Sequence, residues 1–158
     1  LLNTGAPGEA LASYRKAVET IATADVPAEV KEATKRNGLY NEARVALAKK
    51  DLATAKARAD AYRKEAEAKS VPFELRQSHE LAGRIATEEG DYARAIQELG
   101  EANRQNPMTL YLSAVAFKKS GDAGKAKEMA DKAANFNGLN LIYPYGRGKA
   151  KDMLATLS

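Results

Sequence analysis

The sequence lacks cysteine and tryptophan altogether and has one histidine among its 158 residues. Without cysteine the chain has neither a disulfide framework nor a Cys-ligated metal. The absence does not indicate whether the protein resides in an oxidising or a reducing compartment. A zinc site needs several ligands at short spacing, which a lone histidine, His79, does not supply. We therefore expect no metal and no other cofactor, and we interpret His79 as a packing residue.

Long apolar runs are also absent, so no segment reaches the roughly 20 residues of a membrane-spanning helix. The net charge of +4, with acidic and basic residues interspersed, is typical of a solvated helical surface and makes nucleic acid an unlikely partner. No serine stands in a Gly-x-Ser-x-Gly motif. The Gly-Arg-Gly-Lys of residues 146–149 lacks the remaining residues of a phosphate-binding loop, and we interpret it as a flexible turn. The sequence predicts no enzymatic activity for this segment.

What the chain does have is a patterned stretch at residues 90–107, GDYARAIQELGEANRQNP. Asp91 is a good helix N-cap, and Pro107 prevents the helix from continuing. Ala95, Leu99 and Ala102 recur at i, i+4 and i+7, which places them on one face of an α-helix. Together with the small residues at 82–83 of the preceding helix, they predict a helical hairpin with close helix contacts.

This stretch resembles the tetratricopeptide repeat (TPR) of bacterial TPR proteins. The matching positions are Gly83, Tyr92, Ala95, Leu99, Ala102 and Pro107. His79 stands where the family usually has tryptophan, and Ala82 where it has leucine. The resemblance implies an all-α fold, a TPR-like α-solenoid of stacked antiparallel hairpins.

Similar patterns recur along the chain, with an aspartate before the second helix of each hairpin at Asp51, Asp91 and Asp122. A single hairpin cannot bury its apolar stripe, but stacked hairpins can. We expect a single TPR-like domain over 1–158, with a half repeat at about 5–24 and repeats at about 28–69, 72–106 and 107–137. A capping helix is expected at about 144–157. The missing half repeat and the absence of an initiator Met suggest a piece of a longer protein.

In TPR arrays the first helix of each pair lines a concave groove that holds a peptide, and the resemblance places candidate partner-binding residues there. They are Asn37, Tyr40, Asn41, Arg44, Glu80, Arg84, Tyr111 and Lys118. Tyr40 with Asn41 and Arg44 forms an aromatic, amide and guanidinium set that can hold a peptide backbone or a carboxylate. The alternatives are that these are ordinary polar positions, or that the chain's own helices fill the groove.

The function expected on this basis is a non-catalytic protein–protein interaction or scaffolding module for a protein or peptide partner of unknown identity. One alternative is an RNA-binding helical-repeat module, because some helical hairpin repeats read RNA one base per repeat. Another is an accessory segment of an enzyme whose catalytic part lies upstream. The compartment and the oligomeric state are unknown, although the lack of cysteine and the resemblance to exported bacterial proteins favour the periplasm over the cytoplasm.

Overall fold

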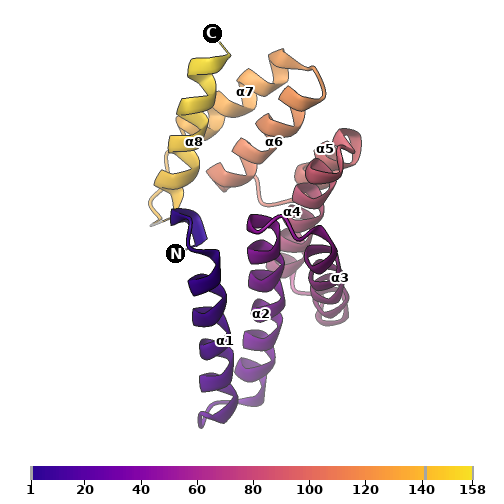
Figure 1. Cartoon of the computed structure of the whole chain (residues 1–158), viewed down its shortest axis with the longest axis vertical. Helices are drawn as coiled ribbons and strands as arrows, with labels where there is room; N and C mark the ends of the chain where they lie inside the picture. Colours follow the sequence, from indigo (N-terminus) through magenta and orange to yellow (C-terminus); the bar gives the residue numbers. More distant parts are fainter. Residues whose placement is uncertain (1, 141, 158) are drawn as a thin grey trace. The chain divides into compact units, whose positions relative to one another are not determined.

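A computed structural model describes residues 2–140 and 142–157, and this part of the chain is all-helical, with no strand (Figure 1). After a short 3-10 helix at Leu2–Thr4, eight α-helices follow in the described residues. They are α1 (Pro7–Thr23), α2 (Ala28–Ala48), α3 (Leu52–Lys69), α4 (Pro72–Glu89), α5 (Tyr92–Glu101), α6 (Pro107–Lys119), α7 (Ala123–Ala134) and α8 (Tyr143–Thr156). The expected all-α class is confirmed. None of these helices is long and apolar enough to cross a membrane.

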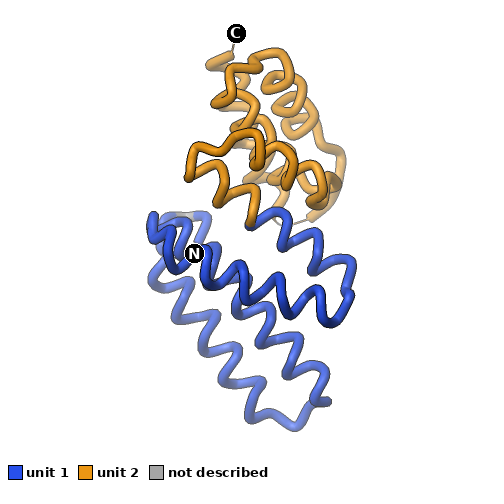
Figure 2. Tube along the Cα trace, turned by 90° about the vertical axis from the view of Figure 1, so that its right-hand side faces the viewer, with its two compact units in different colours: residues 1–81 blue, residues 82–158 orange. Residues whose placement is uncertain are grey.

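The chain divides into two compact units, residues 1–81 and 82–158, and α4 contributes residues to both (Figure 2). In the first unit, α1 packs against α2 and α2 packs against α3. In the second unit, α5 packs against α6, α6 packs against α7, and α8 contacts both α6 and α7.

The same turn joins α2 to α3, α4 to α5 and α6 to α7. At each turn the aspartate amide donates to the carbonyl five residues earlier, at 3.0 Å for Asp51, 2.9 Å for Asp91 and 3.0 Å for Asp122. The residue before each aspartate has a positive φ: 62° at Lys50, 82° at Gly90 and 89° at Gly121. This combination ends a helix in a left-handed residue and satisfies its last carbonyls.

The three aspartates then start the next helix. The side chain of each accepts a hydrogen bond from the backbone N–H three residues later, at 3.0, 3.1 and 2.9 Å in chain order. These bonds satisfy amides that have no partner inside the helix. The expected caps at Asp51, Asp91 and Asp122 are confirmed. The same turn therefore connects the two helices of each of the three hairpins.

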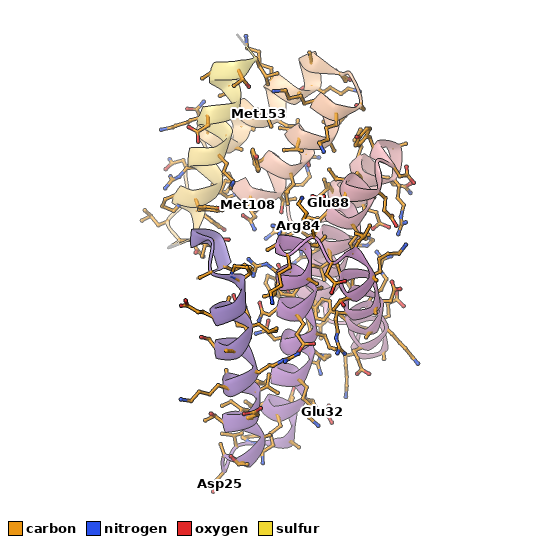
Figure 3. All side chains as sticks on the ribbon, viewed as in Figure 1. Asp25, Glu32, Arg84, Glu88, Met108 and Met153 are labelled. Carbon is orange, nitrogen blue, oxygen red and sulfur yellow. The ribbon has the colours of Figure 1, made fainter. Side chains whose placement is uncertain are left out.

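Small residues form the helix contacts. In the first unit Ala43 of α2 and Ala55 of α3 are fully buried. In the second unit, Ala126, Ala130 and Ala133 of α7 are fully buried as well. The α7 alanines belong to a core cluster with Leu110 and Met129, against which Met153 of α8 (labelled in Figure 3) packs. Alanine seams let the helix backbones approach closely, as the sequence predicts.

Two details differ from the sequence-based expectations. First, α5 ends at Glu101 rather than at Asn106, because Ala102 is extended with ψ at 176°. Asn103 then turns the chain by accepting from the Gln105 amide at 3.0 Å, and Asn106 caps α6 by accepting from the Met108 amide at 2.9 Å.

Second, residues 146–149 are helical, in the first half of α8, and do not form the flexible turn expected from their glycines. Gly146 is buried, and a Cβ atom added to it would lie 2.8 Å from the backbone N of Met108 and 3.0 Å from the carbonyl carbon of Pro107. The glycine is needed because the backbone of α8 meets the start of α6 there.

Candidate functional site

The first unit contains an open groove of about 670 Å3, lined by side chains of α1, α2 and α3. Ligand pockets in proteins commonly have volumes of about 300–1,000 Å3. We call it the α1–α3 groove. Its apolar part consists of Tyr14 and Val18 from α1 and Gly38 and Leu39 from α2. The three larger side chains are only half-buried, so the groove offers apolar surface to a partner.

Gly38 allows α1 to approach α2 at the bottom of this groove. A Cβ atom at position 38 would lie 3.1 Å from Cγ2 of Val18. That distance is shorter than about nine in ten real contacts of this kind, so a larger residue would require the Val18 side chain to shift by a few tenths of an ångström. The glycine therefore sets how closely Val18 packs against α2.

Ion pairs join α2 to both neighbouring helices along the rim. Glu42 of α2 accepts from Nε of Arg15 in α1 at 3.2 Å and pairs with Nε of Arg58 in α3 at 2.9 Å. Toward the other end, Glu32 pairs with Nζ of Lys69 at 2.9 Å. The arginine side chains are 58% and 45% exposed. Such exposed pairs contribute only about 0–1 kcal/mol each to stability, so their charges are available for function without being needed for the fold.

Glu32, labelled in Figure 3, lies in the N-terminal half of α2. Its hydrogen bond from Lys69 lowers the pKa of the carboxyl group below its ordinary value. The carboxylate is therefore charged at neutral pH, and the Lys69 ammonium balances its charge.

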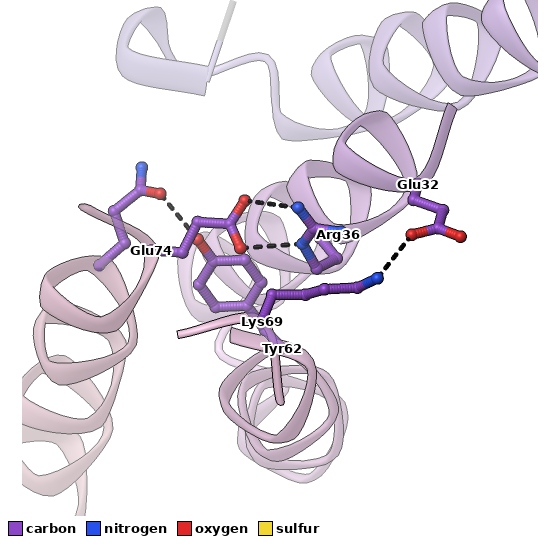
Figure 4. A network of polar contacts seen from close by, with 6 residues as sticks. Glu32, Arg36, Tyr62, Lys69 and Glu74 are labelled. Atoms are coloured by element: carbon purple, nitrogen blue, oxygen red, sulfur yellow. Dashed lines mark hydrogen bonds and ion pairs between the residues drawn. The ribbon is translucent and has the colours of Figure 1, made fainter. Parts of the chain in front are cut away.

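A buried polar network begins at Arg36, which lines the groove (Figure 4). Glu74 of α4 accepts two hydrogen bonds from Arg36, at 2.8 Å from Nε and 3.2 Å from Nη2. The Arg36 and Glu74 side chains are only 9% and 15% exposed. The hydrogen bond to Glu74 raises the pKa of Arg36. Beside this pair, the buried Tyr62 hydroxyl donates to Oε1 of Gln77 at 2.7 Å.

Burial also raises the pKa of Tyr62, so this phenol stays neutral and keeps its proton as a donor. The network fixes α4 against α2 and α3. Because α2 and α3 are two of the three helices that line the groove, these contacts also hold two of its walls in place.

Tyr40, Asn41 and Arg44 come together, as their spacing on one helix face implies. The Arg44 guanidinium lies 5.3 Å from the centre of the Tyr40 ring, and its Nη1 donates to Oδ1 of Asn41 at 3.5 Å. Tyr40 is only 7% exposed and Asn41 only 8%. The Tyr40 ring packs 5.5 Å from the Tyr62 ring, centre to centre. Because Tyr40 and Asn41 are buried, they take part in the packing of the first unit. Binding of a partner protein by these residues stays a prediction.

The other candidates in the first unit differ in exposure: Asn37 is exposed, while Glu80 is 6% exposed. In the second unit Arg84 is half-buried in α4. Tyr111 and Lys118 of α6 contact α8, because Nζ of Lys149 lies 5.9 Å from the Tyr111 ring centre and Nζ of Lys118 donates to the Thr156 hydroxyl at 3.1 Å. These two candidates of α6 therefore contact the chain's own last helix, although Tyr111 is only half-buried and Lys118 is exposed.

None of the eight candidate residues lines the α1–α3 groove. Successive residues of a helix are rotated by about 100°, so the groove-lining positions of α2, such as Leu39 and Glu42, lie nearly opposite to Asn37, Asn41 and Arg44. The sequence did not predict the groove, because the resemblance places candidate residues only on the first helix of each hairpin and on one face of it. The glycine at position 38, facing the apolar stripe of α1, is the signal that could have found it.

Nδ1 of His79 in α4 accepts a hydrogen bond from Nη2 of Arg63 in α3, at 3.0 Å. Among the described residues, no three His, Asp or Glu side chains gather where they could hold a metal ion. Comparisons with protein-family models, curated proteins and solved structures find no match.

Proposed function

We propose that the chain is a TPR-like α-solenoid segment that acts as a non-catalytic protein-interaction or scaffolding module. The observation that carries this proposal is the α1–α3 groove, which exposes the apolar side chains of Tyr14, Val18 and Leu39 in a cavity of about 670 Å3. Exposed apolar grooves between helices commonly receive an apolar helix face of a partner.

The repeat architecture supports the same proposal. Three hairpins are closed by one turn device, with a left-handed residue followed by a capping aspartate at Asp51, Asp91 and Asp122. Helical hairpin repeats of this kind stack so that neighbours bury each other's apolar faces, and the stacked surfaces serve for binding.

A site-specific crosslinking experiment tests the proposal. A photoreactive amino acid is placed at position 39 in the groove and, as the matched control, at position 97, an exposed position of α5. We expect crosslinks from position 39 to one partner segment, identified by mass spectrometry, and none to that segment from position 97. Absence of a groove-specific crosslink in lysate of the native host would contradict the interaction role.

A further inference from the structure

The charges of the α1–α3 groove are unevenly distributed along its length. At one end Arg15 and Arg58 share the single carboxylate of Glu42, which leaves one positive charge in excess. Toward the other end, the lining carries the carboxylates of Glu19, Glu32 and Glu65 and the ammonium groups of Lys35 and Lys69. The Arg36 guanidinium there is paired with Glu74, so this end has no excess of positive charge. Glu32 and Glu42 are ten residues apart on α2, which corresponds to about 15 Å along the helix axis.

The arginine end has unused hydrogen-bond donors. Arg15 and Arg58 both contact Glu42 through Nε. The two guanidinium groups together carry about ten N–H donors, whereas one carboxylate accepts about four hydrogen bonds, so donors remain that Glu42 does not use. The Arg15 and Arg58 side chains are 58% and 45% exposed. A guanidinium group matches the geometry of a carboxylate. Arg15 of α1 and Arg58 of α3 contact different oxygens of the Glu42 carboxylate.

The dimensions and the chemistry of the groove together specify an occupant. The α1–α3 groove, about 15 Å long, fits roughly ten residues of α-helix. Its apolar surface, formed by Tyr14, Val18 and Leu39, fits anchors at i, i+3 or i+4, and i+7 of an amphipathic helix. The excess positive charge at the Arg15 and Arg58 end complements an acidic side chain.

We propose that the α1–α3 groove binds an amphipathic α-helix of a partner protein, whose Asp or Glu at one end of the apolar stripe enters between Arg15 and Arg58. This inference rests on the proposed interaction function and names the chemistry of the partner. The carboxylate fixes the direction of the bound helix, while the apolar anchors supply most of the contact area.

A displayed library of helix-forming 14-residue peptides tests the proposal. The library is selected against the full chain. We expect enrichment of peptides with an apolar i, i+3 or i+4, i+7 stripe and an acidic residue at one end. The best peptide, made with its Glu and with Gln in its place, is then measured by fluorescence anisotropy.

Three variants complete the test: Arg15→Gln with Arg58→Gln, Leu39→Glu, and a control that removes two exposed arginines elsewhere, Arg94→Gln with Arg104→Gln. Circular dichroism verifies that each is folded. We expect the acidic peptide to bind at least tenfold more weakly to the Arg15/Arg58 variant and to Leu39→Glu, but equally to wild type and control. The Gln peptide should distinguish wild type from the Arg15/Arg58 variant by less than threefold, which isolates the carboxylate contact.

The outcomes separate the two levels of the argument. The selection could enrich apolar peptides with no preference for an acidic residue, whose binding is lost with Leu39→Glu but is unchanged with the Arg15/Arg58 variant. This result would overturn the inference and leave the proposed function standing. If no peptide is enriched, or if the selected peptide binds the Leu39→Glu variant as tightly as the wild type, both the inference and the proposed function are overturned. Self-association of the wild type that Leu39→Glu abolishes would show that a second copy is the occupant, and would also overturn the inference.

Discussion

Gly83→Ala tests how tightly α4 and α5 are packed. A Cβ atom at this position would lie 2.5 Å from Cγ and 2.9 Å from Cδ2 of Leu99, and 3.3 Å from the Ala95 carbonyl oxygen. Leu99 is only 1% exposed and belongs to a buried core cluster, so its side chain can move only by displacing other core side chains. Overpacking of this kind costs about 1–3 kcal/mol, and the gain from alanine over glycine in a helix offsets about 0.5–1 kcal/mol of it. We expect a net loss of roughly 1–2 kcal/mol.

The matched control is Gly100→Ala in α5, where no atom lies within 4 Å of the added Cβ. The control should gain up to about 1 kcal/mol from helix propensity alone. Urea unfolding followed by circular dichroism measures both. In a Leu99→Ala background, where the side chain that clashes is gone, Gly83→Ala should cost nothing. Equal stability of Gly83→Ala and Gly100→Ala would refute the close approach of α4 and α5.

Three further predictions concern the network, the turns and pH. Glu74→Ala leaves the guanidinium of Arg36 buried without its partner and should cost about 3–5 kcal/mol in urea unfolding, whereas a loss below 1 kcal/mol would contradict its burial. Gly90→Ala should destabilise by about 1 kcal/mol because its φ is 82°, while Lys50→Gly, at φ 62°, should stabilise in the same assay. Hydrogen bonds from Thr54 lower the pKa of Asp51, so its stabilising effect is present above the unfolded pKa and is lost as pH falls through the lower folded pKa. Asp51→Asn keeps a capping side chain and should flatten the loss of thermal stability below about pH 4, and an unchanged acid profile would count against this assignment.

The sequence predicts the helices and the turns well because their causes are local. The aspartate caps depend on residues three apart, and the alanine seams follow helical periodicity, so Asp122 and Ala126 can be assigned without any tertiary information. The last helix was also predictable, within one residue at each end, from Pro144 and the apolar spacing that follows it.

The site was not predictable in the same way because it depends on which helix faces which. Tyr40 has the polar neighbours of a binding residue, but its ring packs against that of Tyr62, which lies 22 positions later in the chain. Gly146 reads locally as a turn, yet the backbone of α6 lies against it, and only that contact explains a helical glycine there. The groove itself combines Val18, Leu39 and Arg58 from three helices, a set that no local pattern joins.

The most direct test of the central claim, that the partner lies in the α1–α3 groove, is a two-dimensional NMR titration. Isotope-labelled full chain is titrated with the acidic peptide selected from the library. We expect amide chemical-shift changes concentrated at Val18, Leu39 and Arg58, which line the groove. Changes centred instead on Asn37 and Arg44, on the opposite face of α2, would contradict it.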